Sequence, residues 1–270
     1  MTEHKAVPFT HKDLDALSPL QPDGWPDIRN DFRFYLDNGF CCPVKVTARQ
    51  QIIGVGVLIL FGITGWVAHI IVDPNRRNRG LGLFIVRHLL EAAEQKGCRS
   101  VSLVATDLGY PVYLKAGFAA QTRYLFFSRE NRDRADELET AHIRRATTGD
   151  RADILALDRE ISGENRSALI SGFLRTAWVC DANHTVNGYY LPGLREGTIL
   201  ALDEPSGLEL MAWKYRDVHS AVLPAENRAG IRFLKVNGFQ QVMTAKRMVW
   251  GHPFTWHPRG IFSRIAGNFG

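Results

Sequence analysis

The pattern of apolar and polar residues predicts adjacent strands followed by a long helix in the first hundred residues. The predicted strands are rich in β-branched and other apolar side chains and cover residues 40–47, 50–61 and 65–72. A helix over residues 79–95 follows, with apolar residues at helical spacing, and Lys96-Gly97 is a typical helix end. Shorter predicted elements are a strand over 6–9, helices over 13–17 and 27–36, and a strand over 100–105.

The stretch from Ile52 to Val72 has no formally charged residue and is long enough to cross a membrane as a helix. It is rich in β-branched residues, however, and the turn sequence Gly62-Ile63-Thr64-Gly65 divides it. We therefore predict two buried strands joined by a hairpin, and no membrane partner.

The composition is that of a folded protein with a basic surface. Of the 270 residues, 45% are hydrophobic and 23% are charged, as in ordinary globular proteins. The net charge of +5 and the pI near 9.1 suit an anionic ligand. The arginines are scattered and no stripe of aromatic and basic residues recurs, so no nucleic-acid partner is expected.

The cysteines and the N-terminus indicate a cytoplasmic protein. The four cysteines form no C-x-x-C motif, and Cys41 and Cys42 should point to opposite faces of one strand. We therefore expect neither disulfides nor a metal. The first fifteen residues contain no apolar signal core.

Residues 73–82, DPNRRNRGLG, join the third of these strands to the long helix and form a candidate anion site. The first turn of a helix leaves backbone N–H groups unpaired, and glycine lets a phosphate approach them. No Gly-Lys-Ser/Thr follows, which excludes a Walker loop, and Ile85 stands where a dinucleotide fingerprint needs its third glycine. By itself the loop could equally be a solvated basic turn.

A second motif follows the strand over 100–105. Residues 106–109 begin a short helix, and Tyr113 stands four residues before Gly117-Phe118. With Arg77-x-x-Gly80-x-Gly82 and the long helix in the same order, residues 10–128 resemble the GCN5-related N-acetyltransferase (GNAT) family. The segments Gly24-Trp25 and Asp31-Phe32-Arg33 resemble the entry of a tandem-domain branch that includes the YitH-like acetyltransferases.

The resemblance implies that acetyl-CoA is a co-substrate and that its acetyl group passes to an amine. It places the pyrophosphate on the glycine loop and pantetheine along the preceding strand, so the expected cofactor-binding residues are Ile71, Val72, Arg77, Asn78, Arg79, Gly80, Leu81, Gly82 and Leu83. A backbone N–H near Val72 would face the thioester carbonyl, and Tyr113 would protonate the leaving thiolate.

The base that removes a proton from the amine is less defined. His69 is the one imidazole in the strand over 65–72, but strict alternation would turn it away from Trp66, Ala68 and Ile70. A β-bulge could reverse this, and water is the alternative base. Trp25, Asp31 and Trp66 are candidates for the acceptor pocket; for Trp25 and Asp31, core packing and helix capping are the alternative roles.

The pattern restarts after a charged stretch, which predicts two tandem lobes. We assign residues 1–129 to the catalytic lobe, 130–141 to a linker and 142–270 to a second lobe. Predicted strands at 143–147, 176–180, 185–190, 198–202, 220–223 and 242–249 and helices at 150–160 and 205–213 fill the second lobe. Residues 233–239 echo the segment around Tyr113, with Phe233 in its place, and no glycine loop recurs. The second lobe is therefore expected to be degenerate and to hold no CoA.

The second lobe is expected to shape the acceptor pocket. The candidate contacts are Tyr189, Tyr190, Arg195 and Glu196; a solvated loop is the alternative. The tail, residues 250–270, is expected to pack along the surface of this lobe.

These observations predict an α/β (α+β) protein with two GNAT-like lobes, each a mixed, mostly antiparallel twisted sheet flanked by helices. The expected function is acetyl transfer from acetyl-CoA to a small-molecule amine. A sensor that binds acyl-CoA without turnover, a structural partner subunit and a protein N-acetyltransferase are the alternatives. A monomer and a homodimer are both compatible with the sequence.

Overall fold

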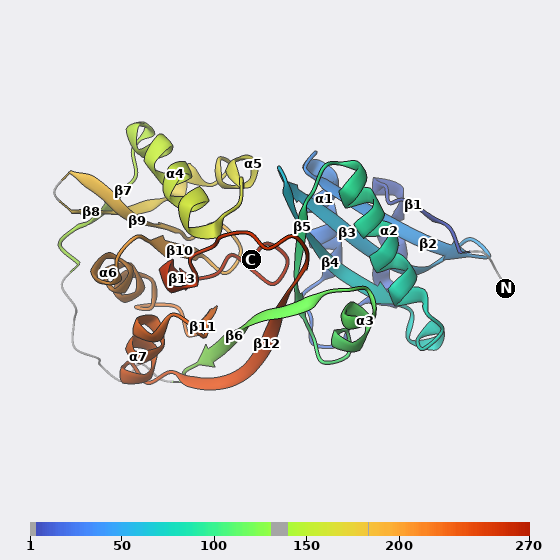
Figure 1. Ribbon diagram of the computed structural model, residues 1–270. Coiled ribbons are helices and arrows are strands. Elements are labelled where there is room, and N and C mark those ends of the chain that lie inside the picture. Colours follow the sequence, from blue (N-terminus) through green and yellow to red (C-terminus); the bar gives the residue numbers. More distant parts are fainter. Residues whose placement is uncertain (1–3, 131–139, 183) are drawn as a thin grey trace. The chain divides into compact units, whose positions relative to one another are not determined.

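The computed structural model describes residues 4–130, 140–182 and 184–270, which form two compact units (Figure 1). Unit 1 contains the chain up to Ala120, together with Met248–Pro253 and Gly267–Phe269. Unit 2 contains Gln121–Arg247, Phe254–Ala266 and Gly270. The chain therefore returns to unit 1 twice after leaving it. Most of the predicted linker, residues 131–139, lies outside the described residues, and the boundaries at 129 and 142 stay a prediction.

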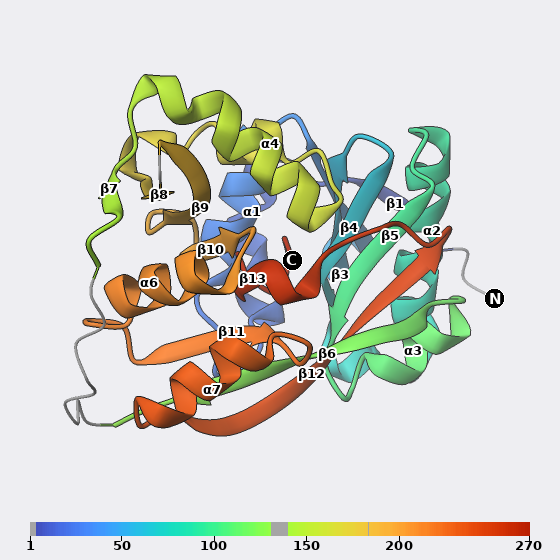
Figure 2. The same cartoon turned by 60° about the vertical axis from the view of Figure 1, so that its left-hand side comes forward.

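Unit 1 is built on strands that follow each other along the chain. Its elements are β1 (Ala6–Pro8), α1 (Ile28–Asp37), β2 (Cys41–Ala48), β3 (Gln51–Phe61), β4 (Thr64–Val72), α2 (Leu81–Gln95), β5 (Ser100–Ala105) and α3 (Tyr110–Lys115), with 3-10 helices at His11–Asp13, Asp15–Leu20 and Pro74–Arg76. Strands β1 to β4 pair antiparallel in chain order, and β5 pairs parallel with β4. Figure 2 shows these strands between α1 on one side and α2 on the other. The strands and long helices predicted here are confirmed, whereas the expected helix at 13–17 is 3-10.

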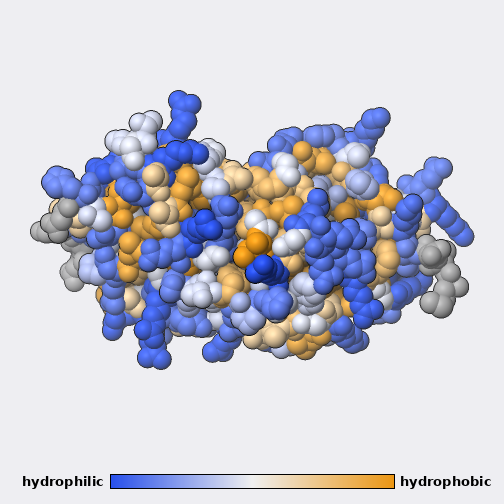
Figure 3. Space-filling model, turned by 45° about the horizontal axis from the view of Figure 1, so that its top comes forward, coloured by the Kyte–Doolittle hydropathy of each residue, from blue (hydrophilic) through white to orange (hydrophobic). Residues whose placement is uncertain are grey.

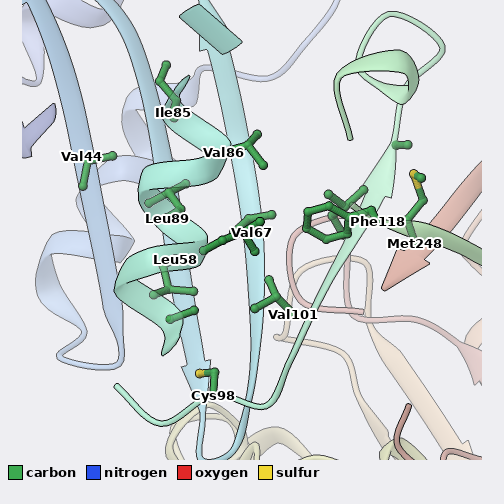
Figure 4. Packing of buried hydrophobic residues seen from close by; sticks show 14 of the residues in the cluster. Val44, Leu58, Val67, Ile85, Val86, Leu89, Cys98, Val101, Phe118 and Met248 are labelled. Carbon is green, nitrogen blue, oxygen red and sulfur yellow. The ribbon is translucent and has the colours of Figure 1, made fainter. Parts of the chain in front are cut away.

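The core of unit 1 lies where α2 packs on the sheet (Figure 4). Ile85 and Leu89 point from the helix onto β3, at the positions of Gly54 and Gly56. A Cβ added to either glycine would come within 2.8 Å of the Ile85 side chain. These two glycines therefore let the helix approach the strand closely. Met248 is fully buried in the same core although it follows Ser128 by more than a hundred residues.

Unit 2 holds a sheet of its own. Its elements are β7 (Ile143–Arg145), α4 (Arg151–Ser162), α5 (Ser167–Ile170), β8 (Trp178–Ala182), β9 (Thr185–Leu191), β10 (Thr198–Ala201), α6 (Glu204–Lys214), β11 (Ser220–Pro224), α7 (Arg228–Val236) and β13 (Ile261–Ser263), with 3-10 helices at Thr148–Asp150, Leu174–Thr176 and Pro258–Gly260. Five strands form an antiparallel sheet in the order β13-β10-β9-β8-β7. Its core packs between α6, α7 and the strands.

Two strands contribute residues to both units, β6 (Ala119–Ser128) and β12 (Gln240–Gly251). They belong to an eight-stranded sheet with the order β1-β2-β3-β4-β5-β12-β6-β11. Among the described register pairs, β4–β5 is parallel and the others are antiparallel. The predicted mixed, mostly antiparallel α+β fold is confirmed.

The tail corrects one expectation. Residues 261–265 are buried, and β13 pairs with β10 as an inner part of unit 2. The prediction that residues 250–270 pack along the surface is wrong, because a three-residue strand joining a distant edge leaves no periodic signal in the sequence.

The apolar stretch at residues 52–72 forms β3 and β4, so the predicted hairpin is confirmed. In the part of the chain that the structure describes, no helix has the length and apolar character to cross a membrane. Figure 3 shows one face of the molecule, where hydrophilic side chains surround scattered hydrophobic ones.

Candidate functional site

Helix α2 begins on a loop whose backbone is left-handed at two positions. Asn78 has φ of +60° and Gly80 has φ of +80°. Upstream, the Asp73 carboxylate accepts the N–H of Asn75 at 2.9 Å and starts the 3-10 turn. Gly80 is the N-cap of α2, and within the described residues no side chain caps that helix start. The amides of the first turn are therefore left for an acceptor from outside.

The protein leaves room above the two glycines of this loop. A Cβ added to Gly82 would lie 3.9 Å from the side chains of Val72 and Val112, an ordinary contact distance. At Gly80 no atom of the residues that the structure describes lies within 4 Å of the added Cβ. Arg77 and Arg79 are exposed, and Nε of Arg77 donates to the carbonyl oxygen of Val72 at 3.3 Å. The loop is thus an open, positively charged cradle at a helix N-terminus, as expected for a phosphate site.

Strands β4 and β5 separate beside this cradle. Their parallel register covers three pairs, which end at Trp66 and Ser102. Strand β4 continues to Val72, and on its other side it stays paired with β3 up to Val72 and Gly54. Beyond Trp66, the β5 side of β4 therefore has no described strand beside it. Such an edge can accept an extended ligand through its backbone N–H and C=O groups.

A β-bulge interrupts β4 at His69. The register with β3 shifts between Val55 and Val57, so that His69 and Ile70 together oppose Gly56. His69 has φ of +49°, an uncommon conformation for a residue with a side chain. Its ring contacts Phe32 and Tyr35 of α1, on the face of the sheet opposite α2. Val67 packs in the α2 core, so Trp66 and His69 share the α1 face. Strict alternation predicted that His69 faces away from Trp66. This prediction is wrong, because the extra residue of the bulge reverses the direction of the His69 side chain.

The His69 ring is held by polar groups at both nitrogens. The Tyr35 hydroxyl lies 2.8 Å from Nδ1, and an Asp31 carboxylate oxygen lies 3.4 Å from Nε2. Nδ2 of Asn268 donates to the Tyr35 hydroxyl at 2.6 Å. Sequence reasoning missed Tyr35 and Asn268, which are 233 residues apart. The one signal was the placement of Tyr35 four residues after Asp31, on one face of a predicted helix.

Tyr113 lies on α3, next to the cradle. Val112, its neighbour, is one of the two side chains nearest to Gly82. The Tyr113 ring packs over Gly109, where an added Cβ would come within 2.7 Å of the ring and 3.2 Å of the hydroxyl oxygen. The side chain is half-buried, and burial raises the pKa of Tyr113 to about 12. The phenol therefore stays protonated at neutral pH, as a proton donor must.

The three candidates for the acceptor pocket differ in exposure. Trp25 is 45% exposed and meets His69 edge to face at 5.8 Å. It also lines a hollow of about 390 Å³ together with Gln21 and Asp27. Asp31 keeps 17% of its side chain exposed. Trp66 is fully buried, so the prediction that it lines the pocket is wrong: the ring is part of the core.

The four candidate residues of the second lobe differ in burial. Tyr189 is fully buried and its hydroxyl donates to Asp158 at 2.5 Å, while Tyr190 is 8% exposed. The expectation that these tyrosines offer aromatic contacts to a substrate is wrong, since both rings lie inside unit 2 on β9. Glu196 pairs with Arg264, its carboxylate accepting two N–H groups at 2.7 and 2.9 Å. Arg195 is exposed with φ of +54°. A role for Arg195 and Glu196 in binding the acceptor stays a prediction.

The order β10, α6, β11, α7 in unit 2 repeats the order β4, α2, β5, α3 of unit 1. The edge of β10, however, is occupied by a strand of the same unit. Strand β13 pairs with β10 through Leu200 and Ile261, and the Arg264 N–H donates to the carbonyl of Val222 in β11. The Phe262 ring packs onto Gly207 of α6, where an added Cβ would come within 2.2 Å of it.

Helix α6 also begins differently from α2. Its N-cap Asp203 accepts the Ser206 N–H at 2.8 Å, and Glu204 follows. This helix start is both capped and acidic, and either feature disfavours a phosphate.

The cysteines Cys41, Cys42, Cys98 and Cys180 are all free thiols. Among the described residues, no group of three His, Cys, Asp or Glu side chains is placed to hold a metal ion.

Known proteins resemble part of this chain in sequence and the whole chain in fold. Residues 9–118 match the profile of the Acetyltransferase (GNAT) family. A glucosamine 6-phosphate N-acetyltransferase from Trypanosoma brucei brucei is 36% identical over 61 residues, which are 23% of this chain and 42% of that protein. The chain thus matches less than half of the length of this relative.

Two solved structures match nearly the whole chain. A putative acetyltransferase from Pyrococcus horikoshii has a TM-score of 0.83 at 17% identity, covering 100% of this chain and 97% of that one. A tandem GNAT protein from the clavulanic acid biosynthesis pathway has a TM-score of 0.60 at 15% identity, covering 94% and 100%. At such identities the likeness concerns the fold, and it confirms the predicted tandem arrangement. The YitH-like branch stays a prediction.

Proposed function

We propose that this chain moves an acetyl group from acetyl-CoA to the amine of a small molecule, because residues 9–118 match the profile of the Acetyltransferase (GNAT) family. One observation carries the proposal: the edge of β4 that separates from β5 leads directly to a helix start that no described side chain caps. An extended, anionic thioester fits this pair of features, because it needs backbone partners along its length and an anion site at its end.

In this proposal the donor lies along β4 and ends on the glycine loop. The amides from Asn78 to Leu83 hold the pyrophosphate, and the exposed Arg77 and Arg79 add positive charge. The backbone of Ile71 and Val72 binds the pantetheine arm. The open space above Gly80 and Gly82 supports this placement, since a Cβ there would meet the ligand rather than the protein.

The reaction itself needs few protein groups. The neutral amine nitrogen forms a bond to the thioester carbonyl carbon, and the carbon–sulfur bond then breaks. The carbonyl oxygen gains negative charge in between, and a backbone N–H near Val72 stabilises it. Tyr113 gives its proton to the leaving thiolate. The bound ammonium loses one proton before the attack, to a base on the acceptor side for which His69 and water are the two candidates. The nitrogen loses a second proton after the bond to carbon forms, and a proton from solvent restores Tyr113.

The acceptor is a small cationic amine in this proposal. Trp25 offers a partly exposed aromatic ring and Asp31 a partly exposed carboxylate, and both contact His69. An aromatic ring and a carboxylate together suit a protonated amine on a compact ring or chain. The similarity to a glucosamine 6-phosphate N-acetyltransferase makes an amino sugar phosphate the first acceptor to test.

Unit 2 holds no CoA in this proposal. The edge of β10 carries β13, and the start of α6 is acidic and capped. A sensor without turnover is the second candidate, which the protonated, half-buried Tyr113 beside the cradle disfavours.

Mass spectrometry of the acceptor tests the proposal. The full chain is incubated with acetyl-CoA and, separately, glucosamine 6-phosphate, a polyamine, an aminoglycoside, amino acids and a peptide with a free amino terminus. We expect N-acetylation of one small amine. Modification of the peptide alone would replace the small-molecule acceptor with a protein one.

A further inference from the structure

A chain of polar groups in unit 1 connects the C-terminal segment to the candidate acceptor site. Asn268 contacts Tyr35, Tyr35 contacts Nδ1 of His69, and Nε2 of His69 faces Asp31. Tyr35 is fully buried, Asn268 is 7% exposed and the His69 side chain is 9% exposed. Asp31, the last member, is the one that reaches solvent most, at 17%.

In this series of polar groups, each group directs a hydrogen toward the next, from Asn268 to Asp31. The amide nitrogen of Asn268 can only donate, so the Tyr35 oxygen accepts at 2.6 Å. We infer that the hydroxyl hydrogen of Tyr35 then goes to Nδ1 of His69, which lies 2.8 Å away. A neutral imidazole that accepts at Nδ1 carries its hydrogen on Nε2. The N–H of His69 is therefore directed at Asp31.

The contact at Nε2 depends on this tautomer. At 3.4 Å the Nε2–Asp31 contact is long for a hydrogen bond, but a polar N–H still attracts a carboxylate at this distance. The other tautomer would place a lone pair against the negative charge. The left-handed backbone of His69 and the rings of Trp25, Phe32 and Tyr35 keep the imidazole in this position.

We propose that Asn268 and Tyr35 are positioning residues that hold His69 as the Nε2–H tautomer and thereby fix the Asp31 carboxylate for the amino group of the acceptor. Resting on the proposed function, this makes His69 a positioning residue as well, because its Nε2 is already protonated. Asp31 first binds the acceptor as its ammonium form, and water then takes a proton from it to give the neutral amine.

We call the four groups Asn268, Tyr35, His69 and Asp31 the relay. Nitrogen NMR of the histidine rings in the full-length protein tests this relay without any substrate. The His69 signals are assigned by their loss in His69→Gln. In the unaltered protein we expect a hydrogen on Nε2 and none on Nδ1. In Asn268→Asp the new carboxylate can only accept, so the Tyr35 hydrogen turns toward it and Nδ1 must become a donor. We expect Nδ1 of His69 to gain a hydrogen in this variant. Asn165→Asp, which adds the same charge at an exposed site, should leave the His69 signals unchanged.

A kinetic measurement adds the consequence for the acceptor. Asn268→Asp and Tyr35→Phe should each raise the KM of the acceptor about tenfold and leave the KM of acetyl-CoA within about twofold. Tyr35→Phe, which keeps the buried ring, serves if Asn268→Asp does not fold.

Failure of the relay and failure of the proposed function give different results in these experiments. A hydrogen on Nδ1 in the unaltered protein, or the same tautomer in Asn268→Asp, overturns the relay whatever the activity. A relay intact by NMR with no acetylated product counts against the proposed function instead.

Discussion

Trp66 of β4 lies opposite Ser102 of β5, and in the described chain this is the last register pair between the two parallel strands. Three features follow within the next sixteen residues: the bulge at His69, the strand edge up to Val72, and the cradle of Gly80 and Gly82. A single strand and its loop thus supply both the edge that would receive the donor and the imidazole beside the candidate acceptor site.

Gly82 gives the sharpest test of donor binding. A Cβ added to Gly82 would meet no atom of the described residues closer than 3.9 Å, so Gly82→Val is expected to obstruct the ligand rather than the fold. We expect the affinity for acetyl-CoA to fall at least about tenfold, equivalent to about 1.4 kcal/mol, by calorimetry. Gly39→Val is the matched control, since among the described residues nothing lies within 4 Å of a Cβ added there. An unchanged affinity in a folded Gly82→Val protein would remove the pyrophosphate from this loop.

Tyr113→Phe separates chemistry from binding. The ring contact with Phe118 and the packing over Gly109 should survive, because only the hydroxyl is removed. We expect kcat to fall about a hundredfold or more, the usual scale for a general acid, with little change in acetyl-CoA binding. Steady-state kinetics checks this. A kcat equal to that of the unaltered protein would leave Tyr113 as a packed residue only.

The raised pKa of Tyr113 predicts the alkaline behaviour. Burial raises this pKa to about 12, and the protonated phenol is the active form. Ionisation of Tyr113 should therefore not lower kcat below about pH 11. Its folded-state pKa exceeds the unfolded value near 10, so the contribution to stability is complete below about pH 10 and disappears as the pH rises through about 12. Ultraviolet titration against Tyr113→Phe measures the ionisation. A Tyr113 that titrates near pH 10 would contradict the prediction.

The filled edge in unit 2 predicts one acetyl-CoA per chain. Strand β13 covers β10, and Asp203 caps the acidic start of α6. Calorimetric titration of the unaltered protein should give a single site, and Gly82→Val should weaken all of the observed binding. Two sites per chain, or a strong site that persists in Gly82→Val, would show that unit 2 binds acyl-CoA as well.

The sequence was sufficient for elements whose signal is local. The apolar period located β3, β4 and α2, and the uncharged stretch at 52–72 proved to be a hairpin. The glycine loop was placed correctly at the start of α2, because a helix N-terminus and its glycines are close neighbours in the chain.

What the sequence could not supply depends on contacts between distant segments. The direction of His69 follows from a bulge opposite Gly56, and the relay needs Asn268, which follows Tyr35 by 233 residues. The burial of Trp66 and Tyr189 depends on packing from both sides of their sheets. Met248, which follows β6 by more than a hundred residues, completes the core of unit 1 through a contact that local patterning does not reveal.

Acceptor-dependent release of the CoA thiol by the full chain tests the central proposal most directly. Acetyl-CoA is held constant and the amines are added one at a time, with Tyr113→Phe measured in parallel. The proposal predicts that one small amine accelerates thiol release well above the rate without acceptor and that Tyr113→Phe loses most of this acceleration. Acetyl-CoA binding with no acceleration by any amine would contradict it and favour a sensor without turnover.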